Sequence, residues 1–148
     1  MSEGSVVLRA VDIQLARDAE VFSESILSQE IVGLAGLDGH GQAQFLETLA
    51  GVLLPTQGRV EALQGDCVAQ IETLSDAANA RVGYLPSDRK RNGIFPELSV
   101  ADNFMLGNLN DFSRRGWLKR DTIEHSIEAF RDELSMSYAS VTMPINRL

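Results

Sequence analysis

The feature of this sequence that most constrains its fold is a glycine-rich segment, residues 36–43, between an apolar run and a helical pattern. The run, residues 31–35, is short and continuously apolar, as expected of a strand buried on both faces. A helical pattern follows as far as Ala50, and Gly51 is its expected C-cap. Glycines let backbone N–H groups converge on an anion, and the positive end of a helix completes the cradle. The order strand, glycine turn and helix therefore predicts a phosphate-binding loop.

The spacing inside this segment matches the phosphate-loop pattern G-x-x-x-x-G-K-[ST] at its glycines but not at its last two positions. Gly36 and Gly41 occupy the two glycine positions, and Gly39 adds another. Gln42 stands where the pattern has lysine, and Ala43 stands where it has the hydroxyl that binds Mg²⁺. The predicted nucleotide-binding residues are Gly36, Leu37, Asp38, Gly39, His40, Gly41, Gln42 and Ala43.

These two departures predict weak nucleotide binding. A hydrogen bond to a charged group contributes roughly 1.5–3 kcal/mol, against about 1 kcal/mol between neutral groups, so glutamine at position 42 lowers the affinity for phosphate. Ala43 offers no oxygen to Mg²⁺. Phosphoryl transfer depends on positioning and on charge neutralisation by that lysine and metal. We therefore expect ATP to bind weakly and Mg²⁺ not to be held by this chain, and we assign no catalytic residue and no metal site.

Composition and charge exclude other classes of partner. The formal net charge is −8, whereas a nucleic-acid backbone requires a basic face, so we expect no nucleic-acid partner. The single cysteine, Cys67, has no internal disulfide partner, which fits a reducing cytosol. No signal peptide is recognisable, and no run approaches the ~20 apolar residues that span a bilayer. We therefore expect no direct membrane insertion.

Hydrophobic periodicity predicts the elements around the glycine segment. The expected strands are residues 6–11, 20–27, 59–63 and 81–85, the first two forming an antiparallel pair with one solvated face. The expected helices are residues 76–80, 99–106 and 120–135. Ser99 and Asp102 resemble a capping box at the start of the second helix. The chain is therefore expected to have a strand-rich part followed by a helical part.

Several segments in a fixed order resemble one protein family. Residues 30–41 resemble the opening "E-I-x-G-x-x-G-L-x-G-x-G" of the second nucleotide-binding half of bacterial monosaccharide ABC transporter ATP-binding proteins, of the ribose, galactose and xylose type. Residues 54–60 look like that half's "L-P-x-x-G-x-V", residues 83–95 like its "G-Y-x-P-E-D-R-K-x-x-G-L", and residues 98–103 like its "L-S-V-x-E-N". Residues 143–148 look like the lead-in to the signature motif, with Leu148 as its first residue, so the resemblance implies a domain truncated just before that motif.

This resemblance implies an α/β fold. The expected fold is a partial P-loop NTPase (ABC ATPase) domain with an antiparallel β subdomain, an incomplete core sheet and the start of a helical subdomain. Residues 1–97 would form the strand-rich core with the degenerate phosphate loop. Residues 98–148 would begin the helical subdomain and end at the first residue of the signature motif. Ser87 departs from the family, whose second half usually has glutamate there.

The resemblance also implies a function, that of the ATP-binding, energy-coupling component of a carbohydrate ABC importer, to which this chain contributes a degenerate nucleotide site. The parent protein would be a sugar-transporting ATPase, and this chain alone would be inactive. Its implied partners are the other nucleotide-binding half and the membrane-spanning permease subunits. The implied location is the cytoplasm, peripheral on the inner face of the cell membrane.

Two alternatives stay open beside this hypothesis. The first is a non-catalytic interaction domain that has the ABC fold and no longer binds nucleotide. Gln42 and Ala43 favour it, whereas the glycines at positions 36, 39 and 41 oppose it. The second is an unrelated P-loop enzyme such as a kinase, which would leave the motif of residues 83–95 without a reason.

Overall fold

The computed structural model describes residues 4–37, 39–107, 113–114, 117–118, 120–135 and 138–147. The chain separates into two compact units, Met1–Tyr84 and Leu85–Leu148. From the sequence we expect a boundary at residue 97, where the strand-rich part gives way to helices. That boundary stays a prediction.

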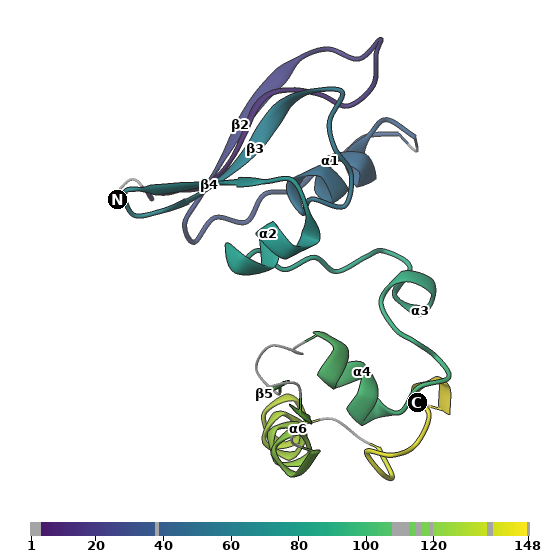
Figure 1. The fold of residues 1–148 in the computed structure, drawn as a ribbon. Helices are drawn as coiled ribbons and strands as arrows, with labels where there is room; N and C mark the ends of the chain where they lie inside the picture. The colour runs from purple at the N-terminus through teal and green to yellow at the C-terminus, as the bar shows by residue number, and fades with distance from the viewer. Residues whose placement is uncertain are drawn as a thin grey trace. The chain divides into compact units, whose positions relative to one another are not determined.

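The first unit is built on a four-stranded antiparallel sheet in the order β2-β1-β3-β4 (Figure 1). The strands are β1 (Val6–Gln14), β2 (Phe22–Leu27), β3 (Gln57–Gln64) and β4 (Cys67–Ile71). The predicted antiparallel pair, β1 and β2, and the predicted strand at residues 59–63 are confirmed. β4 was not expected from the sequence. It pairs back onto β3 through a two-residue turn in which Gly65 has a φ of 61°.

A bulge in β1 decides which of its side chains enter the core. A strict alternation that buries Ala10 would also bury the carboxylate of Asp12. The register of β1 shifts here, Asp12 takes a φ of 50°, and Ile13 is fully buried instead. Gly58 of β3 lies opposite the bulge, where a Cβ would collide with the backbone of Val11 and Asp12. The bulge therefore replaces a buried charge by an apolar side chain and requires glycine on the neighbouring strand.

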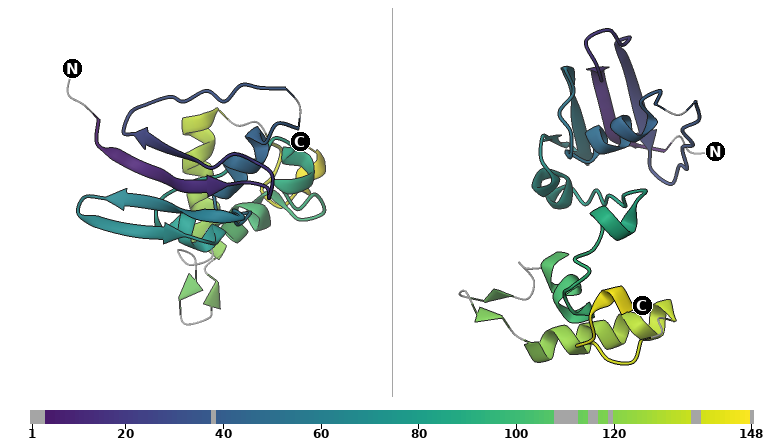
Figure 2. Two further views of the ribbon diagram at one scale, coloured as in Figure 1. Left: turned by 90° about the horizontal axis from the view of Figure 1, so that it is seen from above. Right: turned by 90° about the vertical axis from the view of Figure 1, so that its right-hand side faces the viewer.

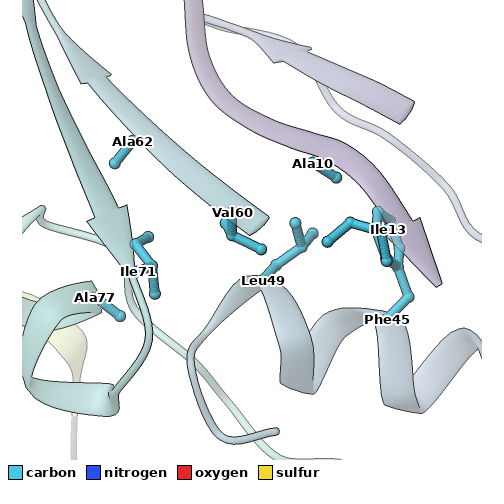
Figure 3. Packing of buried hydrophobic residues seen from close by; sticks show 8 residues of the cluster. All are labelled: Ala10, Ile13, Phe45, Leu49, Val60, Ala62, Ile71 and Ala77. Atoms are coloured by element: carbon cyan, nitrogen blue, oxygen red, sulfur yellow. The ribbon is translucent and has the colours of Figure 1, made fainter. Parts of the chain in front are cut away.

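Two helices cover one face of this sheet (Figures 1 and 2). They are α1 (Gln42–Leu49) and α2 (Leu74–Asn79), close to the helices expected from the sequence. Their apolar side chains meet those of the strands in one cluster (Figure 3), which consists of Ala10, Ile13, Phe45, Leu49, Val60, Ala62, Ile71 and Ala77. Fully burying a side chain such as Ile13 stabilises a fold by roughly 1.5–3 kcal/mol. This cluster fixes α1, and with it the loop at its N-terminus, against the sheet.

Two of the strands predicted from apolar runs do not form. Residues 31–35 and 81–85 contain no strand, and Figure 2 shows the first run as a chain without a strand arrow before α1. Ile31 is 98% exposed and Leu85 is 74% exposed. A strand exists only where a neighbour accepts and donates its backbone hydrogen bonds, and among the described residues no strand pairs with either run. The predictions of a buried strand at residues 31–35 and of a strand at residues 81–85 are therefore wrong.

The second unit is mainly helical. Its elements are α3 (Arg89–Asn92), α4 (Val100–Gly107), β5 (Ser113–Arg114), β6 (Trp117–Leu118), α6 (Arg120–Leu134) and the 3-10 turn η1 (Ile145–Arg147). α4 and α6 confirm the helices predicted from the sequence. Ile123 and Ile127 of α6 are buried with Tyr138, and side chains of α4 and of the 141–143 segment pack around them. α3, by contrast, was not predicted from the sequence.

Polar side chains fix the start of α4. The Ser99 Oγ accepts a hydrogen bond from the Asp102 N–H at 3.0 Å, which confirms Ser99 as the cap. The Asp102 carboxylate accepts from the Ser99 hydroxyl at 2.6 Å rather than from the Ser99 backbone N–H as in a capping box. Asn103 closes the turn before the helix, because its Oδ1 accepts from the Phe95 N–H at 2.7 Å while its Nδ2 donates to the Phe95 carbonyl at 3.0 Å.

Within the described ranges, no helix is long and apolar enough to cross a bilayer.

Candidate functional site

The glycine segment leads directly into α1, and two of its glycines have backbone angles that other residues rarely adopt. Gly41 is the N-cap of α1 with a φ of 94°, and Gly39 has a φ of 81°. Both values lie in the left-handed region, where a Cβ is strained and glycine is not. These two glycines therefore bend the chain sharply into the first turn of the helix. Gly36 has no such angle, so the backbone alone does not explain glycine there.

The N-terminus of α1 is left open to an anion. The first N–H groups of a helix, here those of Gln42, Ala43 and Gln44, have no acceptor inside the helix. Among the described residues no side chain caps this end, and the first turn of α1 contains no acidic residue. The partial positive charge at a helix N-terminus favours an anion over a cation. This end of α1 therefore has the chemistry that the sequence predicted for a phosphate-binding loop.

An open pocket of about 650 Å³ surrounds these groups. Most of the predicted site residues line it together, and they are Gly36, Leu37, Gly39, Gly41, Gln42 and Ala43, joined by Leu34, Ala35 and Gln44. His40 instead lines a neighbouring pocket with Phe22 and Phe45. Asp38, also a predicted site residue, lies outside the described residues. Nucleotide binding by any of these residues stays a prediction.

The side chain of Gln42 folds back across the loop rather than pointing out of it. Its Nε2 donates a hydrogen bond of 3.2 Å to the backbone carbonyl of Leu37. The same carbonyl accepts a hydrogen bond of 3.2 Å from the His40 N–H. The Gln42 amide also lies directly over Gly36, where a Cβ would collide with Nε2 and lie 3.1 Å from Cδ. The position of the pattern's lysine is thus filled by a neutral amide bonded to the loop itself.

Contacts that were not expected from the sequence hold α1 in place. The rings of Phe22 and Phe45 meet edge to face, with centroids 5.2 Å apart. The half-buried Tyr84 hydroxyl makes a hydrogen bond with Glu47, in the middle of α1. Burial, followed by the charge of Glu47 and this hydrogen bond, raises the pKa of the Tyr84 hydroxyl above its ordinary value. No sequence spacing signals a pair that lies so far apart along the chain.

The residues around the loop include no hydroxyl at position 43, since the Ala43 side chain is an exposed methyl group. Among the residues that the structure describes, no three His, Cys, Asp or Glu side chains come together in a group that could hold a metal ion. The expectation that this chain does not hold Mg²⁺ stays a prediction.

Comparison with known proteins identifies the family. Residues 20–145 match the family model described as ABC transporter. The chain is 30% identical over 145 residues to a putative ribose/galactose/methyl galactoside import ATP-binding protein of Halalkalibacterium halodurans, over 98% of this chain and 27% of that protein. It is 31% identical over 147 residues to a ribose import ATP-binding protein of Rubrobacter xylanophilus, over 98% of this chain and 28% of that protein.

A xylose import ATP-binding protein of Photobacterium profundum is 36% identical over 107 residues, which are 68% of this chain and 20% of that protein. The chain thus spans between 20% and 28% of the length of these curated relatives. The family match covers the glycine loop, the strands β2, β3 and β4 and most of the helical unit, and it confirms the fold class and the resemblance found in the sequence. The chain belongs to the ABC transporter family, with the α/β ATPase domain of P-loop NTPases.

Proposed function

We propose that this chain contributes a phosphate loop of weak nucleotide affinity to the ATP-binding, energy-coupling component of a carbohydrate ABC importer. The observation that carries the proposal is the open N-terminus of α1 behind a left-handed glycine turn, in a chain that has Gln42 and Ala43 in place of lysine and a hydroxyl. Relatives named as ribose, galactose and xylose import ATP-binding proteins support carbohydrate as the cargo.

ATP fits this loop better than its Mg²⁺ does. The backbone N–H groups of Gln42, Ala43 and Gln44 would hold phosphate oxygens, and the end of the helix dipole would favour their charge. Neither Gln42 nor Ala43 supplies the positive charge or the oxygen ligand that phosphoryl transfer requires. Bound nucleotide would therefore act here as a structural ligand that is not efficiently hydrolysed.

The proposed partners are the other nucleotide-binding half, which would complete the site, and the membrane-spanning permease subunits. Both follow from the likeness to the second half of monosaccharide importers. The segment with the exposed Arg89, Lys90 and Arg91 and the helical unit would face the permease, and closure of the halves would move them as a rigid body. The protein would then be cytoplasmic and peripheral on the inner face of the membrane.

Calorimetric titration with ATP·Mg²⁺ tests the proposal. The Gln42→Lys/Ala43→Ser double variant restores the charge and the hydroxyl, and each is worth on the order of 1.5 kcal/mol or more. We expect it to bind ATP·Mg²⁺ at least tenfold more tightly than the unaltered chain. A folded double variant that binds no ATP·Mg²⁺ would contradict a nucleotide site in this loop.

The second candidate function is a non-catalytic interaction domain with no nucleotide. The bond between Gln42 and the Leu37 carbonyl favours it, because the loop then satisfies its own polar groups without a ligand. Both functions predict little heat with the unaltered chain, and the double variant separates them. Circular dichroism of each protein shows whether a silent titration comes from a folded chain.

A further inference from the structure

The loop contains an internal contact that a bound phosphate would have to displace. The carbonyl of Leu37 accepts from both the Gln42 side chain and the His40 N–H, at 3.2 Å each. A carbonyl oxygen carries partial negative charge and repels an anion unless a donor lies between them. The donor here is one of the two N–H groups of the Gln42 amide, and a phosphate that takes this N–H leaves the Leu37 carbonyl with only its bond to the His40 N–H.

Resting on the proposed function, we infer that Gln42 locks the ligand-free loop by bonding to the Leu37 carbonyl and thereby competes with nucleotide phosphate, rather than serving as a weak phosphate ligand. The two roles predict opposite changes in ATP affinity when the Gln42 side chain is shortened. If Gln42 is a ligand, shortening it weakens ATP binding. If it is a lock, shortening it removes a competitor and strengthens ATP binding.

Glycine at position 36 is explained by the same contact. Its backbone angle is one that other residues adopt, but a Cβ there would collide with the Gln42 amide. A Gly36→Ala substitution should therefore push the amide off the Leu37 carbonyl. In a chain that already carries Gln42→Ala, the same substitution meets no amide. The effects of the two substitutions on ATP affinity are thus expected to be strongly non-additive.

The test is a titration with ATP in EDTA, which removes the metal from the comparison. The variants are Gln42→Ala, Gln42→Met, which keeps the length without the donor, and Gly36→Ala alone and with Gln42→Ala. A hydrogen bond between neutral groups corresponds to about a two- to tenfold change in affinity, and this one is open to solvent. We expect Gln42→Ala to bind ATP about two- to fivefold more tightly. Gln70→Ala is the control, because it removes an exposed side-chain amide of the same kind from β4, where it donates to Glu72 and lies outside the candidate site.

Hydrogen exchange of the ligand-free proteins supplies a readout that does not depend on nucleotide. Loss of the bond between Gln42 and Leu37 should speed exchange across residues 36–41 in Gln42→Ala and Gln42→Met, and not in Gln70→Ala. Weaker ATP binding by Gln42→Ala, or unchanged exchange in this loop, would overturn the inference. If exchange rises but no variant binds ATP, including Gln42→Lys/Ala43→Ser, the proposed function fails and the competition with phosphate fails with it. If Gln42→Ala binds ATP more tightly than the unaltered chain, and Gln42→Lys/Ala43→Ser also binds it, the results support both the nucleotide site and the competition by Gln42.

Discussion

The helices α1 and α2 belong to the same unit, but their N-termini differ in how the first backbone N–H groups are capped. α2 begins at Thr73, whose side chain accepts from the Asp76 N–H at 3.2 Å while the Asp76 carboxylate accepts from the Thr73 N–H at 2.9 Å. α1 begins at Gly41, with no described side chain on its free N–H groups. Only α2 satisfies the unpaired donors at its start with side chains of its own sequence. The difference teaches that the first turn of α2 is completed locally, whereas the first N–H groups of α1 stay open to an acceptor from outside the helix.

The largest change in stability should come from a side chain at Gly41, the uncapped N-terminus of α1. Gly41→Ala places a Cβ at a φ of 94° and 3.3 Å from Leu15 Cδ1. We expect a loss of about 2 kcal/mol in the free energy of unfolding, since a left-handed L-residue alone costs roughly 1–2 kcal/mol. Urea denaturation followed by circular dichroism measures it. Gly33→Ala is the control, because a Cβ there meets nothing within 4 Å. Equal stability of the two variants would show that the left-handed turn is not required.

A smaller loss of stability is expected when the capped N-terminus of α2 loses its cap. Thr73→Ala removes the cap of α2 and should lower the free energy of unfolding by about 1 kcal/mol. Thr73→Ser keeps the hydroxyl and should retain most of the stability. The same urea denaturation compares them. A serine variant as unstable as the alanine variant would assign the effect to the lost methyl group rather than to the cap.

The smallest effect concerns pH. The hydrogen bond from the Thr73 side chain, followed by the backbone N–H of Glu72 and then that of Thr73, lowers the pKa of the Asp76 carboxyl below its ordinary value of 3.8. A lowered folded-state pKa means that this stabilisation is complete above that ordinary value and is lost as the pH falls through the folded-state pKa. Stability of the unaltered chain and of Asp76→Asn should therefore converge in acid. A difference that stays constant from pH 7 to pH 2.5 would contradict this origin.

Local signals in the sequence predicted much of the fold. The cap of α4 needs only Ser99 and Asp102, three residues apart, and the glycine turn needs only its own backbone. The cap of α2 is equally local, and yet the helix predicted there begins at residue 76, and Thr73 was not predicted as its cap. The strands at residues 31–35 and 81–85 were predicted wrongly because apolar composition does not specify a neighbour. Pairing is a property of two segments, and one segment cannot reveal it.

In the candidate site, too, the features set by the local sequence could be predicted and those set by side-chain packing could not. Its glycines could be assigned from spacing, because the angles of Gly39 and Gly41 follow from the loop itself. The direction of the Gln42 side chain could not, since it depends on the rotamer that brings Nε2 to the Leu37 carbonyl. The contact between Tyr84 and Glu47 could not be predicted either, because it depends on the packing of α1 against a distant segment.

The unpaired run at residues 31–35 has a consequence for the lifetime of the protein in a cell. Ile31 is 98% exposed, and the run is apolar and pairs with no described strand, whereas a short peptide can add as a strand to another protein's sheet edge. Chaperones and proteases act on the unfolded fraction of a protein in the cell, and a change of about 1–2 kcal/mol in stability changes its abundance several-fold. We therefore expect a partner strand that buries residues 31–35 to lengthen the lifetime of the chain, independently of how tightly the neighbouring loop holds a nucleotide.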